Sequence, residues 1–358
     1  MICPRCHRSY AEAETRCTFD QAELSSTPRI DLLKAGRTRQ LGAILGNRFE
    51  IRGFVGQGGT SRVYLALDHR NQEPVAVKML EPPWAHDRVA RERFMQEAQA
   101  ASRIHHQGVA RIIFVGQRGN GIPYLAMEFL YGETLDAFLK REGTMGLDLL
   151  LPVLKELTAT LQIAHLAGVI HRDVKPENVF LLGEIGEPYA VKLVDFGFAK
   201  LRDSTITAAG IAMGSVEYMA PEQCVTDNVD SRTDVFGLGM LTYRALTGKL
   251  PFDQVPIQDQ LAHNLIAPAP SLISVLEIDP FVSAFVDKCL RKSPHNRYQD
   301  MGEVLADLDA LSDDREPDAS SEEVPTEDIY IPQGPFAQLA AKALYRRLNV
   351  PMPGLLAG

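Results

Sequence analysis

The chain has 358 residues, of which 45% are hydrophobic and 23% are charged, and these proportions are ordinary for a globular protein. No apolar run approaches the roughly 18 residues of a membrane helix, and the N-terminus lacks the apolar core of a signal peptide. The net charge is −9, of which residues 313–328 carry −7, so the rest gives no electrostatic footprint for nucleic acid. The sequence therefore predicts a cytoplasmic protein with neither a membrane nor a nucleic-acid partner.

Three of the five cysteines lie in the first 17 residues, and an odd number without a secretion signal argues against a disulfide framework. Tetrahedral Zn²⁺ takes four N, S or O ligands, and Cys3, Cys6, Cys17 and Asp20 have the spacing of such a site. His7 is a rival for the fourth position, and three free thiols on a disordered tail are the alternative. Residues 1–24 are thus predicted to be a zinc-ribbon-like module that folds only with its metal, followed by a polar linker over 25–48.

Continuous patterning runs from Phe49 to about Leu311. Alternating apolar residues predict strands over 62–67, 74–80 and 124–130, and helical spacing predicts helices over 88–104, 153–164 and 235–246. Because strands precede most of the helices, we expect an α+β protein with a small sheet-rich lobe (49–130) and a larger helical lobe (131–311). The acidic segment 312–334 is predicted to be disordered, and the tail 335–358 to contain a short helix over about 335–348.

The stretch GQGGTSRVY, from Gly56 to Tyr64, has the composition of a phosphate-binding loop, with Ser61 where a G-x-G-x-x-G pattern has its third glycine. A dinucleotide turn runs directly into a helix, whereas this loop is followed by an alternating, strand-like stretch. A Walker loop needs G-K-[ST], which is absent. Two interpretations stay open at this point: a triphosphate lid, whose glycines let backbone N–H groups approach phosphates, and a plain flexible hairpin.

Three further motifs carry charge in apolar surroundings. Lys78 stands in the strand-like Val-Ala-Val-Lys, where it either faces solvent or pairs with phosphates and with Glu97 of the 88–104 helix. The stretch HRDVKPEN, residues 171–178, concentrates charged and polar residues between apolar runs, and Asp195-Phe-Gly follows another apolar strand. That density of charge indicates a functional site.

Together with Ala220-Pro-Glu222, these motifs resemble the protein kinase family over about 49–311, in the family's order and spacing. The likeness is to bacterial serine/threonine kinases of the eukaryotic-like type, some of which carry a short zinc ribbon ahead of the kinase domain. The resemblance implies a bilobal fold, with a small, mainly antiparallel β lobe containing one key helix and a larger helical lobe. It also implies transfer of the γ-phosphoryl of ATP, with Mg²⁺ or Mn²⁺, to Ser or Thr hydroxyls of protein substrates.

The resemblance implies a role for each matching residue. Asp173 would accept the proton of the substrate hydroxyl, Lys175 would offset charge on the γ-phosphoryl, and Lys78, fixed by Glu97, would hold the α- and β-phosphates. Asn178 and Asp195 would hold Mg²⁺. Adenine would lie between Val55, Val63, Ala76 and Phe180, with Met127 guarding a back pocket and the hinge Glu128–Leu130 offering backbone hydrogen bonds. The lid would be formed by Gly56, Gln57, Gly58, Gly59, Thr60, Ser61, Arg62 and Val63.

Residues that have structural roles in the family are also present in this sequence. Asp234 should brace the loop around Asp173, His171 should pack and orient that loop, and Glu222 should form a buried ion pair with Arg297. These features disfavour a small-molecule kinase. Ser215 replaces the more usual Thr but keeps a hydroxyl that could bridge Asp173 and Lys175.

Regulation is implied by Arg172, since kinases with this residue before the catalytic aspartate are often activated when a phosphorylated loop pairs with it. We therefore expect autophosphorylation at Thr205 or Thr207, with homodimerisation as its route; the alternative is that Ser204, Thr205 and Thr207 are ordinary polar loop residues. A second functional alternative is a catalytically silent scaffold that acts through the zinc module and the tail, although no essential residue is missing.

Overall fold

The structure is a computed structural model that describes residues 38–183, 189–196, 216–226 and 229–313, and singly residues 15, 16, 23, 319, 328, 330 and 346. The chain forms two compact units: the first comprises Met1–Leu135 and Val179–Ala212, and the second Asp136–Asn178 and Met213–Gly358. Several predictions fall outside the described residues: the zinc ligands Cys3, Cys6, Cys17 and Asp20, the loop residues Gly197, Ser204, Thr205, Thr207 and Ser215, and most of the predicted tail helix.

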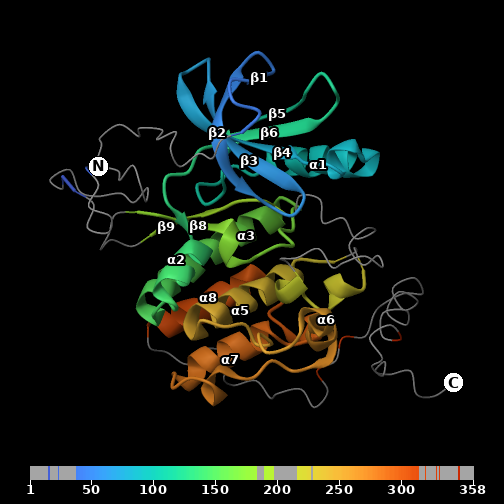
Figure 1. Cartoon of the computed structure of the whole chain (residues 1–358). Coiled ribbons are helices and arrows are strands. Elements are labelled where there is room, and N and C mark those ends of the chain that lie inside the picture. The colour runs from blue at the N-terminus through green and yellow to red at the C-terminus, as the bar shows by residue number, and fades with distance from the viewer. Residues whose placement is uncertain are drawn as a thin grey trace. The chain divides into compact units, whose positions relative to one another are not determined.

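The first unit is built on an antiparallel six-stranded sheet in the order β1-β2-β3-β4-β6-β5 (Figure 1). The strands are β1 (Ile44–Leu45), β2 (Phe49–Gln57), β3 (Ser61–Asp68), β4 (Glu73–Leu80), β5 (Ile112–Gln117) and β6 (Pro123–Glu128). Side chains alternate between the two faces of a strand. One face carries an apolar core that includes Ile51, Tyr64, Val75, Val77 and Ala126. The three strands predicted from alternation are therefore confirmed.

Helix α1 (Arg88–Ala101) packs against β5 and β6 of the same sheet. Its N-terminus is capped by the Asp87 carboxylate, which accepts a hydrogen bond from the Ala90 N–H at 2.7 Å. Phe94, Ala98 and Ala101, whose helical spacing predicted this helix, are buried, and Phe94 and Ala98 pack with Leu80 and Leu125. Helix α1 therefore covers part of the sheet face opposite the apolar core. Ala76 and Lys78 of β4 lie on the same face.

Two boundaries differ from those expected. The predicted linker 25–48 is wrong for its last residues, because Leu45 is buried and β1 pairs with β2. The first unit also includes a small sheet that the sequence-based division placed in the helical lobe: β7 (Glu133–Thr134), β8 (Val179–Leu182) and β9 (Ala190–Leu193), in the order β7-β8-β9. Both differences, at β1 and at the sheet β7-β8-β9, come from strand pairing between separate segments, which local periodicity does not predict.

The second unit is mainly helical, with α2 (Leu135–Glu142), α3 (Leu147–Leu166), α5 (Arg232–Thr247), α6 (Ile257–Ile266), α7 (Pro280–Cys289) and α8 (Met301–Ser312) (Figure 1). Short 3-10 turns connect them: η2 (Pro176–Asn178), η3 (Val216–Tyr218), η4 (Glu222–Cys224), η5 (Leu272–Ser274) and η6 (Pro294–Asn296). Helix α5 is the centre of this unit, since nearly all of its side chains are buried, and it packs against α3 and α7. The two helices predicted in this region are confirmed within α3 and α5.

Helix α3 corrects one reading of the sequence. Among the residues that the structure describes, it is the one helix long and apolar enough to cross a bilayer, although no apolar run of that length was expected. Asp148, Lys155 and Glu156 interrupt the run but leave its average apolar. Because α3 packs against α5 and α8 and buries one face, it serves the second unit as a core helix.

The sequence predicted that the acidic segment 312–334 is disordered, and this prediction is wrong for the residues of the segment that the structure describes. Ala319 and Tyr330 are buried and Asp328 is half-buried, and the contacts of Ala319 and Asp328 are made with the second unit. Composition predicts disorder from low hydrophobicity and high charge, but it does not register specific hydrogen-bond partners elsewhere in the chain.

Candidate active site

The glycine-rich loop joins β2 to β3 as a hairpin. Gly56 pairs with Val63 and Gln57 with Arg62, and the Gly58 N–H donates to the Ser61 carbonyl at 2.8 Å. A strand follows the loop where a dinucleotide turn has a helix, so the dinucleotide interpretation is excluded. Arg62 forms an ion pair with Glu81 at 3.3 Å, and Ser61, only 5% exposed, begins β3.

The glycines of this loop are not required by the packing of the protein. A Cβ atom added at Gly56 or Gly59 would meet nothing within 4 Å, and one at Gly58 would meet only ordinary contacts with Ser61 at 3.7 Å. None of the three has the positive φ that demands glycine. The free space above the backbone is what close approach of a phosphate requires, so the loop fits a triphosphate.

The predicted adenine contacts Val63 and Ala76 lie, together with Met127, on the sheet face opposite the apolar core. Ala76 pairs with Leu65 of β3 and with Met127 of β6, and Val63 pairs with Lys78. Since Val75 and Val77 belong to the core, alternation along β4 places Ala76 and Lys78 on the other face. Ala76 and Met127 are buried, whereas Val55, on the loop side of β2, is half exposed; Phe180 of β8 and Leu130 are half-buried. The first unit thus presents all these predicted contacts.

Lys78 does not face solvent. Its side chain is buried, and its ammonium nitrogen lies 2.8 Å from the Asp195 carboxylate, so the solvent-facing alternative is wrong. Asp195 adopts a left-handed backbone conformation with φ of 58°, which is uncommon for a residue other than glycine. The side chain of Glu97 lies outside the described residues, and its pairing with Lys78 stays a prediction.

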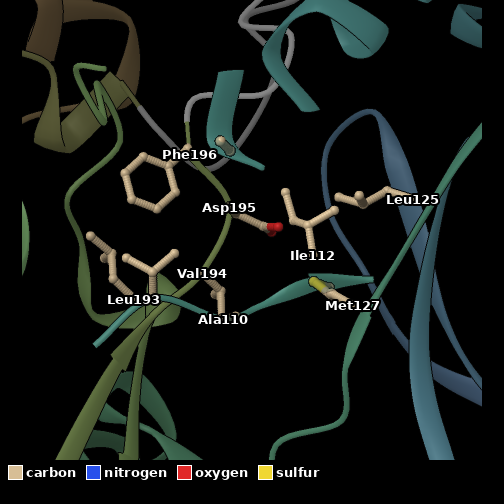
Figure 2. A pocket seen from close by; sticks show the side chains of 10 residues that line it. Ala110, Ile112, Leu125, Met127, Leu193, Val194, Asp195 and Phe196 are labelled. Carbon is tan, nitrogen blue, oxygen red and sulfur yellow. The ribbon is translucent and has the colours of Figure 1, made fainter. Parts of the chain in front are cut away.

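An apolar pocket lined in part by Met127 lies within the first unit (Figure 2). Asp195 projects into it toward Ile112, and it is the charged residue among the side chains that line the pocket: Ala101, Val109, Ala110, Ile112, Leu125, Met127, Leu193, Val194, Asp195 and Phe196. Met127 is one of the side chains that line this pocket, and its guarding role stays a prediction.

The beginning of the hinge is fixed by a set of contacts that the sequence reading missed. The Glu128 N–H donates to the Arg111 carbonyl at 2.9 Å, and its Oε1 accepts from the Arg111 N–H at 2.7 Å. The same oxygen forms an ion pair with Lys192 of β9 at 2.5 Å. Because its N–H is already used, Glu128 has no backbone donor left for an adenine. The signal for Lys192 was present: like Lys78, it is a lysine in an apolar strand.

The catalytic loop of the second unit is organised around Asp234. The buried Asp234 carboxylate accepts hydrogen bonds from the N–H groups of His171 at 2.8 Å and Arg172 at 2.7 Å, as expected, and from the His165 ring at 2.7 Å. Arg172 is held at a φ of 64°, and buried His171 accepts from the Asp173 N–H at 3.2 Å. His165, also missed from the sequence, completes this brace.

Asp173, Lys175 and Asn178 lie together within the second unit. The Lys175 ammonium is 3.1 Å from the Asp173 carboxylate, and the Asn178 side-chain amide donates to that carboxylate at 3.1 Å and to the Asp173 carbonyl at 2.8 Å. With its nitrogen used in this way, Asn178 has its side-chain oxygen left for a metal. That oxygen in the second unit and the Asp195 carboxylate in the first are the hard oxygen ligands that Mg²⁺ prefers.

The expected ion pair of the helical lobe is present. Arg297 donates from both terminal nitrogens to Glu222 at 2.8 Å, and the Thr233 hydroxyl adds a third bond at 2.8 Å. Burial alone would raise the pKa of Glu222, but Arg297 outweighs it and holds that pKa below its ordinary value.

In the described part of the chain, no three His, Cys, Asp or Glu side chains are placed to hold a metal ion. The predicted zinc ligands lie outside that part. Arg16 and Glu23, which flank Cys17 and Asp20 in the sequence, form an isolated antiparallel bridge.

Known proteins agree with the geometry. Residues 49–307 match the protein kinase domain family. A probable serine/threonine-protein kinase of Clostridium acetobutylicum is 34% identical over 270 residues, covering 75% of this chain and 40% of the relative. The chain thus spans about two fifths of the length of the clostridial relatives it matches. Serine/threonine-protein kinase PknA of Mycobacterium tuberculosis is 34% identical over 315 residues, covering 86% of this chain and 72% of the relative.

Among solved structures, the PknI kinase domain of Mycobacterium tuberculosis aligns with 75% of this chain and 98% of its own, with a TM-score of 0.60 at 23% identity. That likeness shows the protein kinase fold. The family match covers well over half of the chain, and the matching relatives are kinases of one kind. The chain therefore belongs to the protein kinase family, among the serine/threonine protein kinases.

Proposed function

We propose that this chain transfers the γ-phosphoryl of ATP to Ser or Thr hydroxyls of protein substrates. The observation that carries the proposal is the arrangement around Asp173: its carboxylate is contacted by Lys175 and Asn178, in a loop braced by a buried acid. A carboxylate so placed can accept the proton of an attacking hydroxyl. Lys175 then stabilises charge on the transferring phosphoryl, which is the main demand of this reaction.

ATP would be held by the first unit. The glycine-rich loop leaves open space beside Gly56 and Gly59, where phosphates can approach the backbone, and Lys78 presents a buried positive charge on the same sheet face as Ala76. Asn178 and Asp195 would hold Mg²⁺, which when bound neutralises phosphate charge. Neither the geometry nor the relatives support the catalytically silent alternative.

The test is phosphate transfer from γ-labelled ATP to a basic protein, with aminoglycosides assayed in parallel for small-molecule activity. We expect Asp173→Asn to lower kcat about a thousandfold, within the range for loss of a general base. Asp309→Asn, which removes the same charge from an exposed ion pair with Lys155, is the matched control and should leave kcat unchanged. An Asp173→Asn variant as active as the parent protein would overturn the proposal.

We further propose that the kinase is activated by autophosphorylation at Thr205 or Thr207, in a homodimer, with Arg172 receiving the phosphate. In support, Arg172 lies in the braced loop beside Asp173. Mass spectrometry of ATP-treated protein should find phosphate on residues 204–215. Unmodified peptides from a fully active sample would contradict this regulation and leave the transfer reaction itself standing.

We also propose a structural Zn²⁺ held by Cys3, Cys6, Cys17 and Asp20, with His7 as the alternative fourth ligand. The spacing of the cysteines and the bridge between Arg16 and Glu23 support it. Metal analysis of purified protein should find about one zinc per chain, and Cys3→Ser should lose it; an equal zinc content in both samples would contradict the site.

A cytoplasmic role in bacterial signalling, without membrane or nucleic-acid partners, is likewise a proposal. It rests on composition and on the kinds of relative that match. Cell fractionation of the tagged protein tests the location, and recovery in the membrane fraction would contradict it.

A further inference from the structure

The loop between α7 and α8 binds a carboxylate from a distant part of the chain. One oxygen of Asp328 accepts a hydrogen bond from the Lys292 N–H at 2.6 Å, and the other accepts from the Ser293 N–H at 3.1 Å and the Asn296 side-chain amide at 3.2 Å. Three donors from five consecutive residues thus converge on one side chain. Hydrogen bonds to an ionised acceptor are about twice as strong as neutral ones.

A second attachment lies nine residues earlier in the same segment. The buried Ala319 N–H donates to the Asp307 carboxylate at 3.0 Å, and that carboxylate also accepts from the Tyr298 hydroxyl at 2.6 Å. Tyr330, two residues beyond Asp328, is buried as well. Ala319 and Asp328 are thus both hydrogen-bonded to the helical part of the second unit, so more than one group of the acidic segment is held there.

Beneath Asp328 lies a buried lysine that supports α6. Lys292 is 1% exposed, and its ammonium donates to the carbonyls of Asn264 at 3.0 Å and His263 at 3.3 Å, at the end of α6. Burial lowers the pKa of Lys292 to about 7, with Arg297 acting in the same direction and Asp328 opposing it. Asn264 in turn donates to the Glu217 carbonyl of η3 at 3.4 Å.

These contacts form a continuous series from the acidic segment to the turn that precedes Ala220-Pro-Glu222. Asp328 fixes the backbone of Lys292, Lys292 holds the end of α6, and α6 contacts η3. Uncompensated burial of a lysine charge is costly, and the negative charge of Asp328 acts to raise the pKa of Lys292.

We propose that the loop 292–296 is a carboxylate-binding site, and that its ligand is Asp328 of the chain's own acidic segment, which thereby clasps the second unit and supports α6. The inference rests on contacts within the second unit and does not depend on the proposed reaction. It assigns to the acidic segment a role that its composition does not suggest.

The test is hydrogen exchange of backbone amides in the full chain, comparing Asp328→Asn with Glu277→Gln. Glu277 is exposed on the same unit, so its change removes an equal charge without touching the loop. We expect the Lys292 and Ser293 amides to exchange about tenfold faster or more in Asp328→Asn, the effect of losing a hydrogen bond to a charged group. The control should match the parent protein.

A double-mutant cycle with Asn296→Ala makes the test specific to this contact. If Asn296 acts through the Asp328 carboxylate, the two substitutions together should accelerate exchange of the Ser293 amide by less than the product of their separate effects. Unchanged exchange in Asp328→Asn, or independent effects in the cycle, would overturn the proposal. Circular dichroism of each variant confirms that it is folded before exchange is measured.

Discussion

The glycine-rich loop and the catalytic loop, which would serve the same step of the proposed reaction, are built in opposite ways. The glycine-rich loop is attached by its two strands, by the turn hydrogen bond from Gly58 to Ser61 and by one from the Glu81 N–H to the Thr60 carbonyl, and a side chain added at Gly56 or Gly59 would meet nothing within 4 Å. The catalytic loop is held by a buried carboxylate that takes two of its backbone N–H groups.

The glycine beside the catalytic loop and the glycines of the glycine-rich loop differ in the same way. Gly237 of α5 faces the catalytic loop so closely that an added Cβ would lie 2.9 Å from the Val174 Cβ and 3.1 Å from the Val174 carbonyl oxygen. Glycine there is required by the protein, whereas Gly56 is left open toward a ligand. A general base must be positioned in advance, but a loop that admits and releases a nucleotide needs open space.

The largest effect is expected from removing the brace. Asp234→Ala leaves the N–H groups of His171 and Arg172 without their buried acceptor, so the free energy of unfolding should fall by about 2–5 kcal/mol. Misplacement of Asp173 should lower kcat about a hundredfold or more, with little change in KM for ATP. Steady-state kinetics measure kcat, and urea denaturation measures the free energy of unfolding. A kcat within about threefold of the parent value would contradict the idea that Asp234 positions the catalytic loop.

Gly237→Ala tests the close approach of α5. The added methyl group cannot be placed without moving Val174, and overpacking of this kind costs about 1–3 kcal/mol of unfolding free energy. We expect kcat to fall with stability, since Val174 adjoins Asp173. Denaturation midpoints of the variant and the parent protein give the measurement; an unchanged midpoint would mean that the loop is as yielding as the glycine-rich one.

Gly56→Ala, in contrast to Gly237→Ala, should affect ATP binding and should not lower stability. With open space and no left-handed φ, the substitution should leave the unfolding free energy unchanged or raise it by about 0.4–1 kcal/mol. KM for ATP should nevertheless rise about tenfold, because the methyl group occupies the approach to the phosphates. Gly119→Ala, an equally open position outside the loop, is the control. Equal KM values for the two variants would argue against phosphate contact at Gly56.

Lys192→Met probes the hinge, which resembles the catalytic loop in being held by charge. Loss of the ion pair to Glu128 should raise KM for ATP about threefold to tenfold and leave kcat unchanged, since a partly buried pair contributes about 1 kcal/mol. Lys155→Met, which breaks the ion pair to Asp309, serves as the control. A drop in kcat with constant KM would assign Lys192 to the chemistry instead.

The smallest effect is expected at Ser61. Its backbone carbonyl, which receives the Gly58 N–H, is retained in Ser61→Gly, so KM for ATP should change by no more than a few-fold. Measured initial rates over a range of ATP concentrations decide this. A change of about tenfold, or roughly 1.4 kcal/mol, would show that the buried hydroxyl has a specific function.

Much of the fold and of the candidate site followed from local pattern. Alternation placed β3, β4 and β6, and the 3.6-residue period placed α1, α3 and α5, because these periods reflect which face of an element is buried. The ordered motifs around Lys78, Asp173 and Asp195 identified the family before any geometry was known.

The missed features all depend on partners distant in the sequence. The sequence around Lys192 does not indicate that its partner is Glu128, 64 residues earlier. His165 likewise contacts Asp234, which lies 69 residues later. The composition of residues 312–334 predicted disorder, although the donors of the 292–296 loop hold Asp328 in place.

The sequence by itself determined the family and the types of several helices and strands, and it predicted the reacting groups, because periodicity and residue chemistry are local properties of the chain. Tertiary structure alone decided which charges are paired, which glycines are forced by packing and which are left open, and where the acidic segment docks. The physical reason is that hydrogen bonds, ion pairs and steric contacts act over a few ångströms, and only folding brings distant residues within that range.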